Sequence, residues 1–147
     1  MKATMRLGRQ FGHWMLVLVL GLSTGTALAD VVVIVSSSSP VASLGKNQLA
    51  DIFLGKVARF PGGREAVPID QKEGTVERDE FYIRFIGKSS AQMKAYWSKV
   101  IFTGRGQPPR EMADSSDVKK QIAENPNAIG YIDRADVDAS VRILQLK

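Results

Sequence analysis

The sequence has no cysteine, and its single histidine, His13, lies close to the N-terminus. The chain therefore cannot form a disulfide, and packing alone must hold its fold. Beyond His13 the chain also lacks the usual general base, the usual thiol nucleophile and two common ligands of zinc. These absences argue against an enzyme, and we expect no catalytic residue, no metal site and no cofactor.

Long apolar runs are scarce as well, and the clearest one belongs to an N-terminal leader. Three basic residues precede an apolar stretch at 14–22, and a small-x-small site follows at 27–29. A membrane span needs about 20 apolar residues, whereas this stretch is shorter and gives way to glycine, serine and threonine. We therefore predict a cleaved secretory signal peptide at residues 1–29 and a periplasmic mature chain, 30–147, without a stable membrane anchor.

Positive charge is also scarcer than the whole chain suggests. Lys2, Arg6 and Arg9 supply three of the formal +5 charges, and residues 1–29 contain no acid, so the mature chain carries +2. So small an excess gives no reason to expect a nucleic-acid partner. The 118 residues that remain of 147 are enough for one domain with one hydrophobic core.

Strand and helix patterns alternate along the mature chain. Residues 31–35, VVVIV, are apolar without alternation, which is typical of a strand buried on both faces. Further strands are predicted at 66–70, 128–132 and 141–146. Four helices are expected, with apolar positions near residues 49–53, 81–86, 93–101 and 118–122. This order predicts an α/β fold with a mixed sheet of about four strands, flanked by about four helices.

Capping residues mark where two of these helices begin. Gly45 followed by Gln48, and Ser89 followed by Gln92, have the spacing of N-terminal caps. Gly55 is a predicted stop for the first helix. The first and third helices therefore have predictable starting points.

The pair Gly74-Thr75 precedes the second helix and is the first candidate binding site. A helix start offers unpaired N–H groups and the positive end of the helix dipole, so phosphate or sulfate binds there readily. A Gly-Thr pair ahead of a helix is also common as plain capping, and both interpretations stand. Several acids nearby are interpreted as a solvated surface: Asp70, Glu73, Glu77, Asp79 and Glu80.

Two other stretches could contact an anion. Arg105, between two glycines at 103–106, offers a fork of donors, although a flexible turn with a solvated arginine fits equally. The four serines at 36–39 follow the first strand, and α/β folds often place ligand contacts at the carboxyl ends of strands. A serine-rich turn is also simply polar, so this alternative stays open too.

Four segments of the mature chain occur in an order that is specific as a set. They are QLADIFLGK at 48–56, PGGREAVPI at 61–69 after Phe60, GTVERDEF at 74–81 and NAIGYID at 127–133. This ordered set resembles the phosphate ABC-transporter substrate-binding proteins of the type II periplasmic-binding fold, and among them the short, single-lobe members. The resemblance covers residues 31–133 approximately, and it implies one lobe of that fold.

In the larger family the turn before the central helix looks like R-E-x-G-S-G-T-R-D-x-F and binds phosphate. The residues that match this pattern are Gly74, Thr75 in place of serine, Arg78, Asp79 and Phe81. Three positions depart from it. Gln71 replaces an arginine fork, Val76 replaces a glycine that allows close approach, and Glu77 places a negative charge where the pattern has a hydroxyl. These departures predict weak binding unless Lys72, Arg78 or Arg105 compensates.

The resemblance therefore implies a non-enzymatic protein that binds phosphate or a related oxyanion weakly or together with a partner. That partner would be an envelope protein, a transporter permease or a second copy of the chain. The expected anion-binding residues are Gly74, Thr75, Arg78, Ser36, Ser37, Ser38 and Arg105. The alternative is a periplasmic interaction module that reuses the lobe without a ligand.

Overall fold

The computed structural model describes residues 28–147. The prediction of a signal peptide at 1–29 therefore falls almost entirely outside the described residues. Among the residues that are described, no helix has both the length and the apolar character needed to cross a bilayer.

The main sheet has five strands in the order β4-β3-β5-β1-β6. The strands are β1 Val31–Ser36, β3 Val67–Gln71, β4 Arg110–Met112, β5 Ala128–Asp133 and β6 Val141–Ile143. Strand β3 runs parallel to β4 and β5, whereas β1 is antiparallel to β5 and β6. A small parallel pair, β2 Ser43–Leu44 with β7 Gln145–Leu146, lies beside it. The mixed sheet is confirmed, with one strand more than the four expected.

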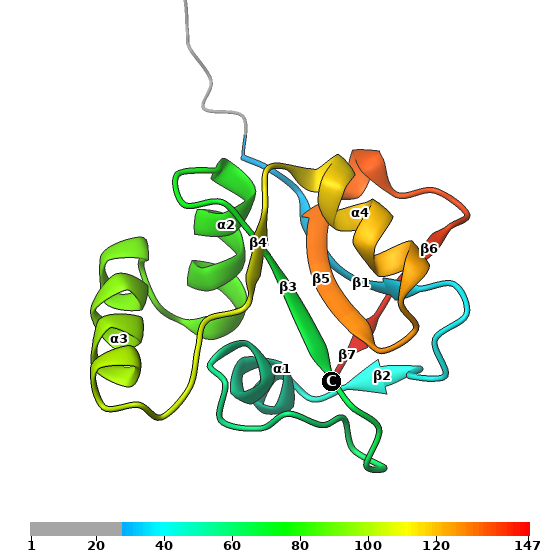
Figure 1. The fold of residues 1–147 in the computed structure, drawn as a ribbon. Helices are drawn as coiled ribbons and strands as arrows, with labels where there is room; N and C mark the ends of the chain where they lie inside the picture. Colours follow the sequence, from blue (N-terminus) through cyan, green and yellow to red (C-terminus); the bar gives the residue numbers. More distant parts are fainter. Residues whose placement is uncertain (1–27) are drawn as a thin grey trace, which may run out of the picture.

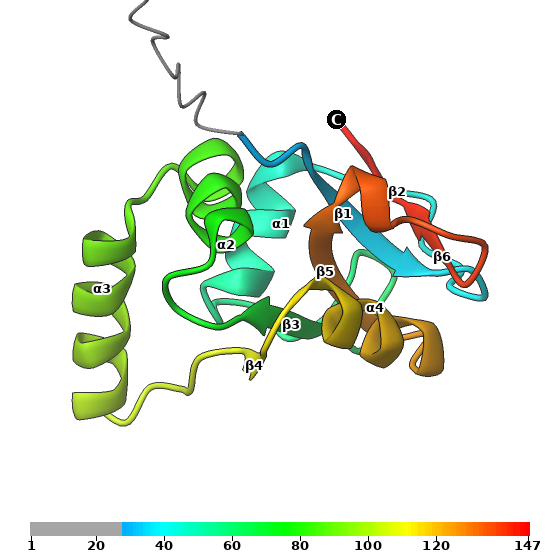
Figure 2. The ribbon, with the colours of Figure 1, turned by 90° about the horizontal axis from the view of Figure 1, so that it is seen from above.

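Helices cover both faces of this sheet (Figures 1 and 2). They are α1 Lys46–Phe53, α2 Val76–Phe81, the π-helical turn η1 Tyr82–Ile86, α3 Ser90–Phe102, α4 Ser115–Glu124 and the short 3-10 turn η2 Arg134–Asp136. Figure 2 shows α4 on one side of the sheet and α1 and α2 on the other, with α3 at the outer edge. The prediction of about four helices is confirmed.

Strand β1 explains how one sheet serves two hydrophobic clusters. Val31, Val33 and Val35 point into the cluster beneath α1, α2 and α3. Val32 and Ile34 point into the cluster beneath α4. Successive side chains of a strand alternate between its two faces, so a strand without polar positions must be covered on both, as the sequence predicted.

The predicted helix starts are confirmed, one strand prediction needs correction, and one strand was not predicted. The Gly45 N–H donates to Gln48 Oε1 at 2.8 Å, and Ser89 with Gln92 forms a reciprocal capping box. The predicted strand 141–146 is divided at Leu144, where the chain leaves β1 and begins to pair with β2. Strand β4 was not predicted because it has only three residues, two of them charged, and it pairs along one edge only.

Gly130 lies where α4 packs directly on the backbone of β5. A Cβ at this position would stand 3.0 Å from Val118 Cγ1, 3.1 Å from Ile122 Cδ1 and 3.2 Å from the carbonyl oxygen of Ile69. The carbonyl belongs to the neighbouring strand and cannot move aside. The glycine of the AIGY segment is therefore required by close packing.

We predict that Gly130→Ala destabilises the protein by about 1–3 kcal/mol, because an added methyl overpacks this contact. Chemical denaturation followed by circular dichroism would measure the change. Gly106→Ala is the matched control, since its Cβ would meet Val100 at an ordinary 3.7 Å. Equal stability of the two variants would contradict the packing explanation.

Candidate functional site

The turn between β3 and α2 has the backbone of an open cradle. Gly74 adopts a φ of 91°, and nothing lies within 4 Å of the position its Cβ would take. Thr75 occupies the N-cap position of α2, but its side chain makes no capping hydrogen bond. Its hydroxyl instead donates to the Lys72 carbonyl at 3.1 Å. The start of α2 is therefore left without a side-chain cap.

Acidic and apolar side chains border this turn. Val76, with an exposed fraction of 56 %, stands at the first position of α2. Glu77 and Asp79 follow in the first helical turn, where carboxylates interact favourably with the helix dipole. They supply negative charge at the place where an incoming anion would need a donor.

Arg78 is largely buried and engaged by carboxylates, although it also lines a hollow beside the turn. Its residue is only 7 % exposed, and its guanidinium lies 3.5 Å from Asp70 and 3.8 Å from Glu111. It also lies over the Tyr82 ring at 5.3 Å from the centroid. Burial is the largest single influence on the pKa of Arg78 and lowers it, but Asp70 together with Tyr82, Tyr131 and Glu111 outweighs burial, so the pKa is raised. The arginine is therefore held by two carboxylates.

The prediction for Asp70 was wrong. This residue was expected on a solvated surface, yet it is 2 % exposed at the end of β3. Its carboxylate accepts hydrogen bonds from the Tyr82 hydroxyl at 2.6 Å, from the Tyr131 hydroxyl and from the Gln71 backbone N–H at 2.8 Å. The one sequence signal for this burial was the place of Asp70 directly after Ile69 in a predicted strand. The structure adds that this strand lies inside the sheet, between β4 and β5.

Gln71, which replaces the arginine of the family pattern, is fully buried. Its Nε2 donates to Ser115 Oγ and to the Tyr131 carbonyl oxygen, both at 3.2 Å. The side chain thus joins β3 to α4 and β5. It supplies no donor to the open turn.

The serine run lies at the opposite end of the sheet from Gly74. Ser36 ends β1, and β1 runs antiparallel to β5, whereas β3 runs parallel to β5. The carboxyl end of β1 therefore meets the amino end of β3. Ser36 Oγ lies 2.9 Å from Ser38 Oγ and 3.3 Å from the Ala123 carbonyl, while Ser37 is exposed. The structure does not bring these serines to Thr75.

Arg105 is also apart from the turn. Its backbone N–H donates to the Val100 carbonyl near the end of α3. The contact from α3 to the turn region comes instead from Lys94, whose ammonium lies 4.0 Å from Glu73. Of the expected anion-binding residues, the structure groups Gly74, Thr75 and Arg78, and places the serines and Arg105 elsewhere.

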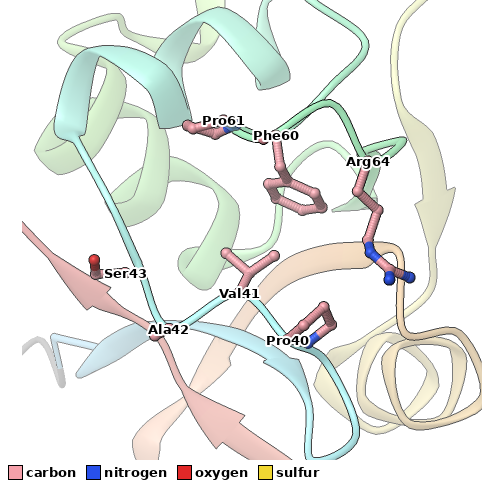
Figure 3. Close-up of a pocket in the computed structure, with 8 residues that line it drawn as sticks. Pro40, Val41, Ala42, Ser43, Phe60, Pro61 and Arg64 are labelled. Carbon is pink, nitrogen blue, oxygen red and sulfur yellow. The ribbon is translucent and has the colours of Figure 1, made fainter.

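The surface of the described residues includes two hollows. One of about 170 Å³ lies beside the turn and has a mixed lining; its residues include Glu73, Arg78, Lys94, Trp97 and Glu111. The other, of about 410 Å³, lies between the segments 40–43 and 60–64. In Figure 3 the Phe60 ring and Val41 face one another there, with Arg64 at one side. None of the expected anion-binding residues lines this second hollow.

Solved structures of other proteins share this fold. No family model and no curated protein matches the sequence. Among solved structures, a protein of Clostridium perfringens assigned as a phosphate ABC transporter substrate-binding protein, solved with bound phosphate, matches with a TM-score of 0.62 and 22 % identity. An ABC-type phosphate transport receptor of Vibrio cholerae matches at 0.62 and 20 %, and PstS of Borrelia burgdorferi at 0.58 and 14 %.

The chain has the fold of one lobe of these proteins. The matches cover 80–81 % of this chain but 45–47 % of the solved ones, so the chain spans about half their length. The resemblance stated from the four sequence segments is confirmed at the level of the fold. Because every one of these identities lies below 25 %, the likeness concerns the fold alone.

We predict that Asp70→Asn destabilises this lobe by about 3 kcal/mol, because the buried Arg78 charge loses its nearest partner. Equilibrium urea denaturation would give the free energy of unfolding. Asp51→Asn serves as control, since its ion pair with Lys56, at 3.6 Å, is largely exposed and should contribute less than about 1 kcal/mol. An Asp70→Asn protein as stable as the control would show that the carboxylate network is dispensable.

We further predict that stability falls as the pH rises above about 10. Burial first, and then the neighbouring Asp70 charge, raise the pKa of Tyr82 and of Tyr131 well above the ordinary value of 10.0. The unfolded chain releases these protons near pH 10 while the folded chain keeps them, so the stabilisation is complete below that pH and lost above it. Tyrosinate absorbance from both residues should appear only with unfolding; ionisation in the folded state would refute this.

Proposed function

We propose that the mature chain is an exported, non-enzymatic binding lobe that holds phosphate or a related oxyanion at the turn 72–76. The observation that carries this proposal is the uncapped start of α2 at the carboxyl end of β3, in a fold shared with a protein solved with bound phosphate. The backbone of Gly74 and the N–H groups that follow Thr75 would surround the anion. Lys72, which is exposed, would supply a nearby positive charge.

The same geometry makes the binding weak. Arg78 is engaged by Asp70 and Glu111, and Glu77 repels an anion from the first turn of α2. One lobe also leaves a bound anion partly hydrated. We therefore propose that a second surface completes the site, supplied by a transporter permease, an envelope protein or a second copy of the chain.

A second candidate function is a periplasmic interaction module without a ligand. One specific observation favours it. The two side chains at the arginine positions of the family pattern, Gln71 and Arg78, are buried and already paired with other residues of the protein. Gln71 donates hydrogen bonds to Ser115 and Tyr131, and Arg78 forms ion pairs with Asp70 and Glu111. On this interpretation the lobe is kept for its surface.

Calorimetric titration with inorganic phosphate tests the first proposal. Residues 30–147 contain every described strand and helix and would serve as the protein. We expect weak binding of phosphate by the parent protein and about three- to fivefold tighter binding by Glu77→Gln. Removing one negative charge about 5 Å from the anion in water makes the free energy of binding more favourable by about 0.8 kcal/mol. Glu124→Gln, at the end of α4 on the other face of the sheet, is the control for net charge.

Two results would separate the candidates. If Glu77→Gln binds phosphate more tightly and the control does not, the anion sits at the turn. If neither the parent protein nor Glu77→Gln gives heat at millimolar phosphate, the oxyanion proposal is wrong and the interaction module is favoured.

A further inference from the structure

Positive charge is concentrated in one segment of the mature chain. Residues 81–110 carry six basic residues and no acidic one: Arg84, Lys88, Lys94, Lys99, Arg105 and Arg110. The mature chain as a whole carries +2, so the residues outside this segment carry a net charge of −4. The segment contains α3 and the loop to β4, and Figures 1 and 2 both show α3 at the outer side of the fold.

The end of α3 exposes two large apolar side chains. Phe102, the last residue of the helix, is 92 % exposed, and Ile101 is 55 % exposed. The loop that follows folds back on the helix end, because the Gly104 N–H donates to the Ile101 carbonyl and the Arg105 N–H to the Val100 carbonyl. Arg105 therefore stays beside these apolar residues. We call Lys99, Ile101, Phe102 and Arg105 the α3 tip.

The outer face of α3 carries small, uncharged residues along its middle, with lysines at its borders and Phe102 at its end. Ala95 and Ser98, seven and four residues before Phe102, lie on the same face and are exposed. They are small and uncharged, and Lys94 and Lys99 lie to either side of them. The opposite face is occupied by Met93 and Trp97, which are buried in the core. The exposed aromatic residue is thus not part of the core that holds the helix.

The basic side chains at this end are available to a partner. Lys99, Arg105 and Arg110 are exposed and form no ion pair with any residue of the described range 28–147. Lys94 has one distant partner, Glu73, at 4.0 Å. The charges of Lys99, Arg105 and Arg110 are therefore unpaired within the described range, whereas Glu73 and Glu111 border the hollow that Lys94 and Ile101 also line.

From these observations we infer that the α3 tip docks on an anionic phospholipid bilayer, with Phe102 and Ile101 in the interface and Lys99 and Arg105 at the headgroups. Apolar side chains ringed by lysine and arginine are the features that hold peripheral proteins at such surfaces. A bilayer accepts a projecting side chain, whereas a protein partner must offer a matching pocket. The net negative charge outside residues 81–110 favours an approach of the lobe to an anionic surface through this basic segment.

Co-sedimentation of residues 30–147 with vesicles tests this inference, and it does not depend on phosphate binding. Residues 30–147 are used because the apolar stretch 14–22 could bind vesicles by itself. We expect binding to phosphatidylcholine mixed with phosphatidylglycerol, little binding to phosphatidylcholine alone, and release as salt is raised. Phe102→Ser should weaken partitioning at least about tenfold, and Lys99→Glu with Arg105→Glu should do the same.

Matched controls lie far from the tip. Ile143→Thr changes an exposed apolar residue on β6, and Lys120→Glu reverses an exposed charge on α4; neither should alter partitioning. A Phe102→Trp variant should be quenched by brominated lipids, whereas the buried Trp97 of the parent should not. Circular dichroism would verify that the variants fold.

Two outcomes would overturn the inference. If the parent protein does not bind the anionic vesicles, the tip does not dock on a bilayer, and an acidic protein surface becomes the better explanation of its charge. If it binds but the tip variants bind as tightly as the controls, the membrane contact lies elsewhere on the chain.

Discussion

The buried carboxylate of Asp70 joins β3 to three other elements. It accepts hydrogen bonds from Tyr82 of η1 and Tyr131 of β5, and it pairs with Arg78 of α2. A charge taken out of water is costly unless such partners surround it, so these elements must meet at one place. The Phe81 ring, stacked on Tyr131 with centroids 4.0 Å apart, packs in the same region. The register of the helical run 76–86 against the sheet follows from this arrangement.

This constraint also shapes the neighbouring turn. An arginine one turn into α2 could reach an anion at the helix start, but Asp70 and Glu111 hold it inside, and Gln71 is fixed to Ser115 and Tyr131. At the turn, Lys72, Glu73, Gly74 and Val76 are exposed, and Thr75 and the acids of the first helical turn are half-buried. The network that fixes the fold therefore leaves neither side chain free to serve the turn.

Much of the fold could be predicted from the sequence, because local signals coincide with tertiary ones. The uninterrupted VVVIV predicted a doubly covered strand, and the caps at Gly45 and Ser89 predicted two helix starts. The candidate site was less predictable. That Ser36 lies far from Thr75 depends on β1 being antiparallel to β5, and strand direction leaves no mark in the local pattern. The burial of Asp70 depends on two tyrosines that are distant in sequence from one another.

The distribution of charge completes this picture. Residues 81–110 contain no acidic residue, so every acid of the lobe lies outside this segment. Two of these acids, Glu77 and Asp79, stand in the first turn of α2. The acids in the first turn of α2 stabilise that helix through its dipole but weaken an anion site beside them, and a projecting Phe102 adds nothing to the core; neither feature favours the binding of an oxyanion. Both features follow if α3 meets a negatively charged surface, since acids elsewhere then turn the other faces away from it. A docking role for α3 would therefore account for more of this charge pattern than the binding of a small anion alone.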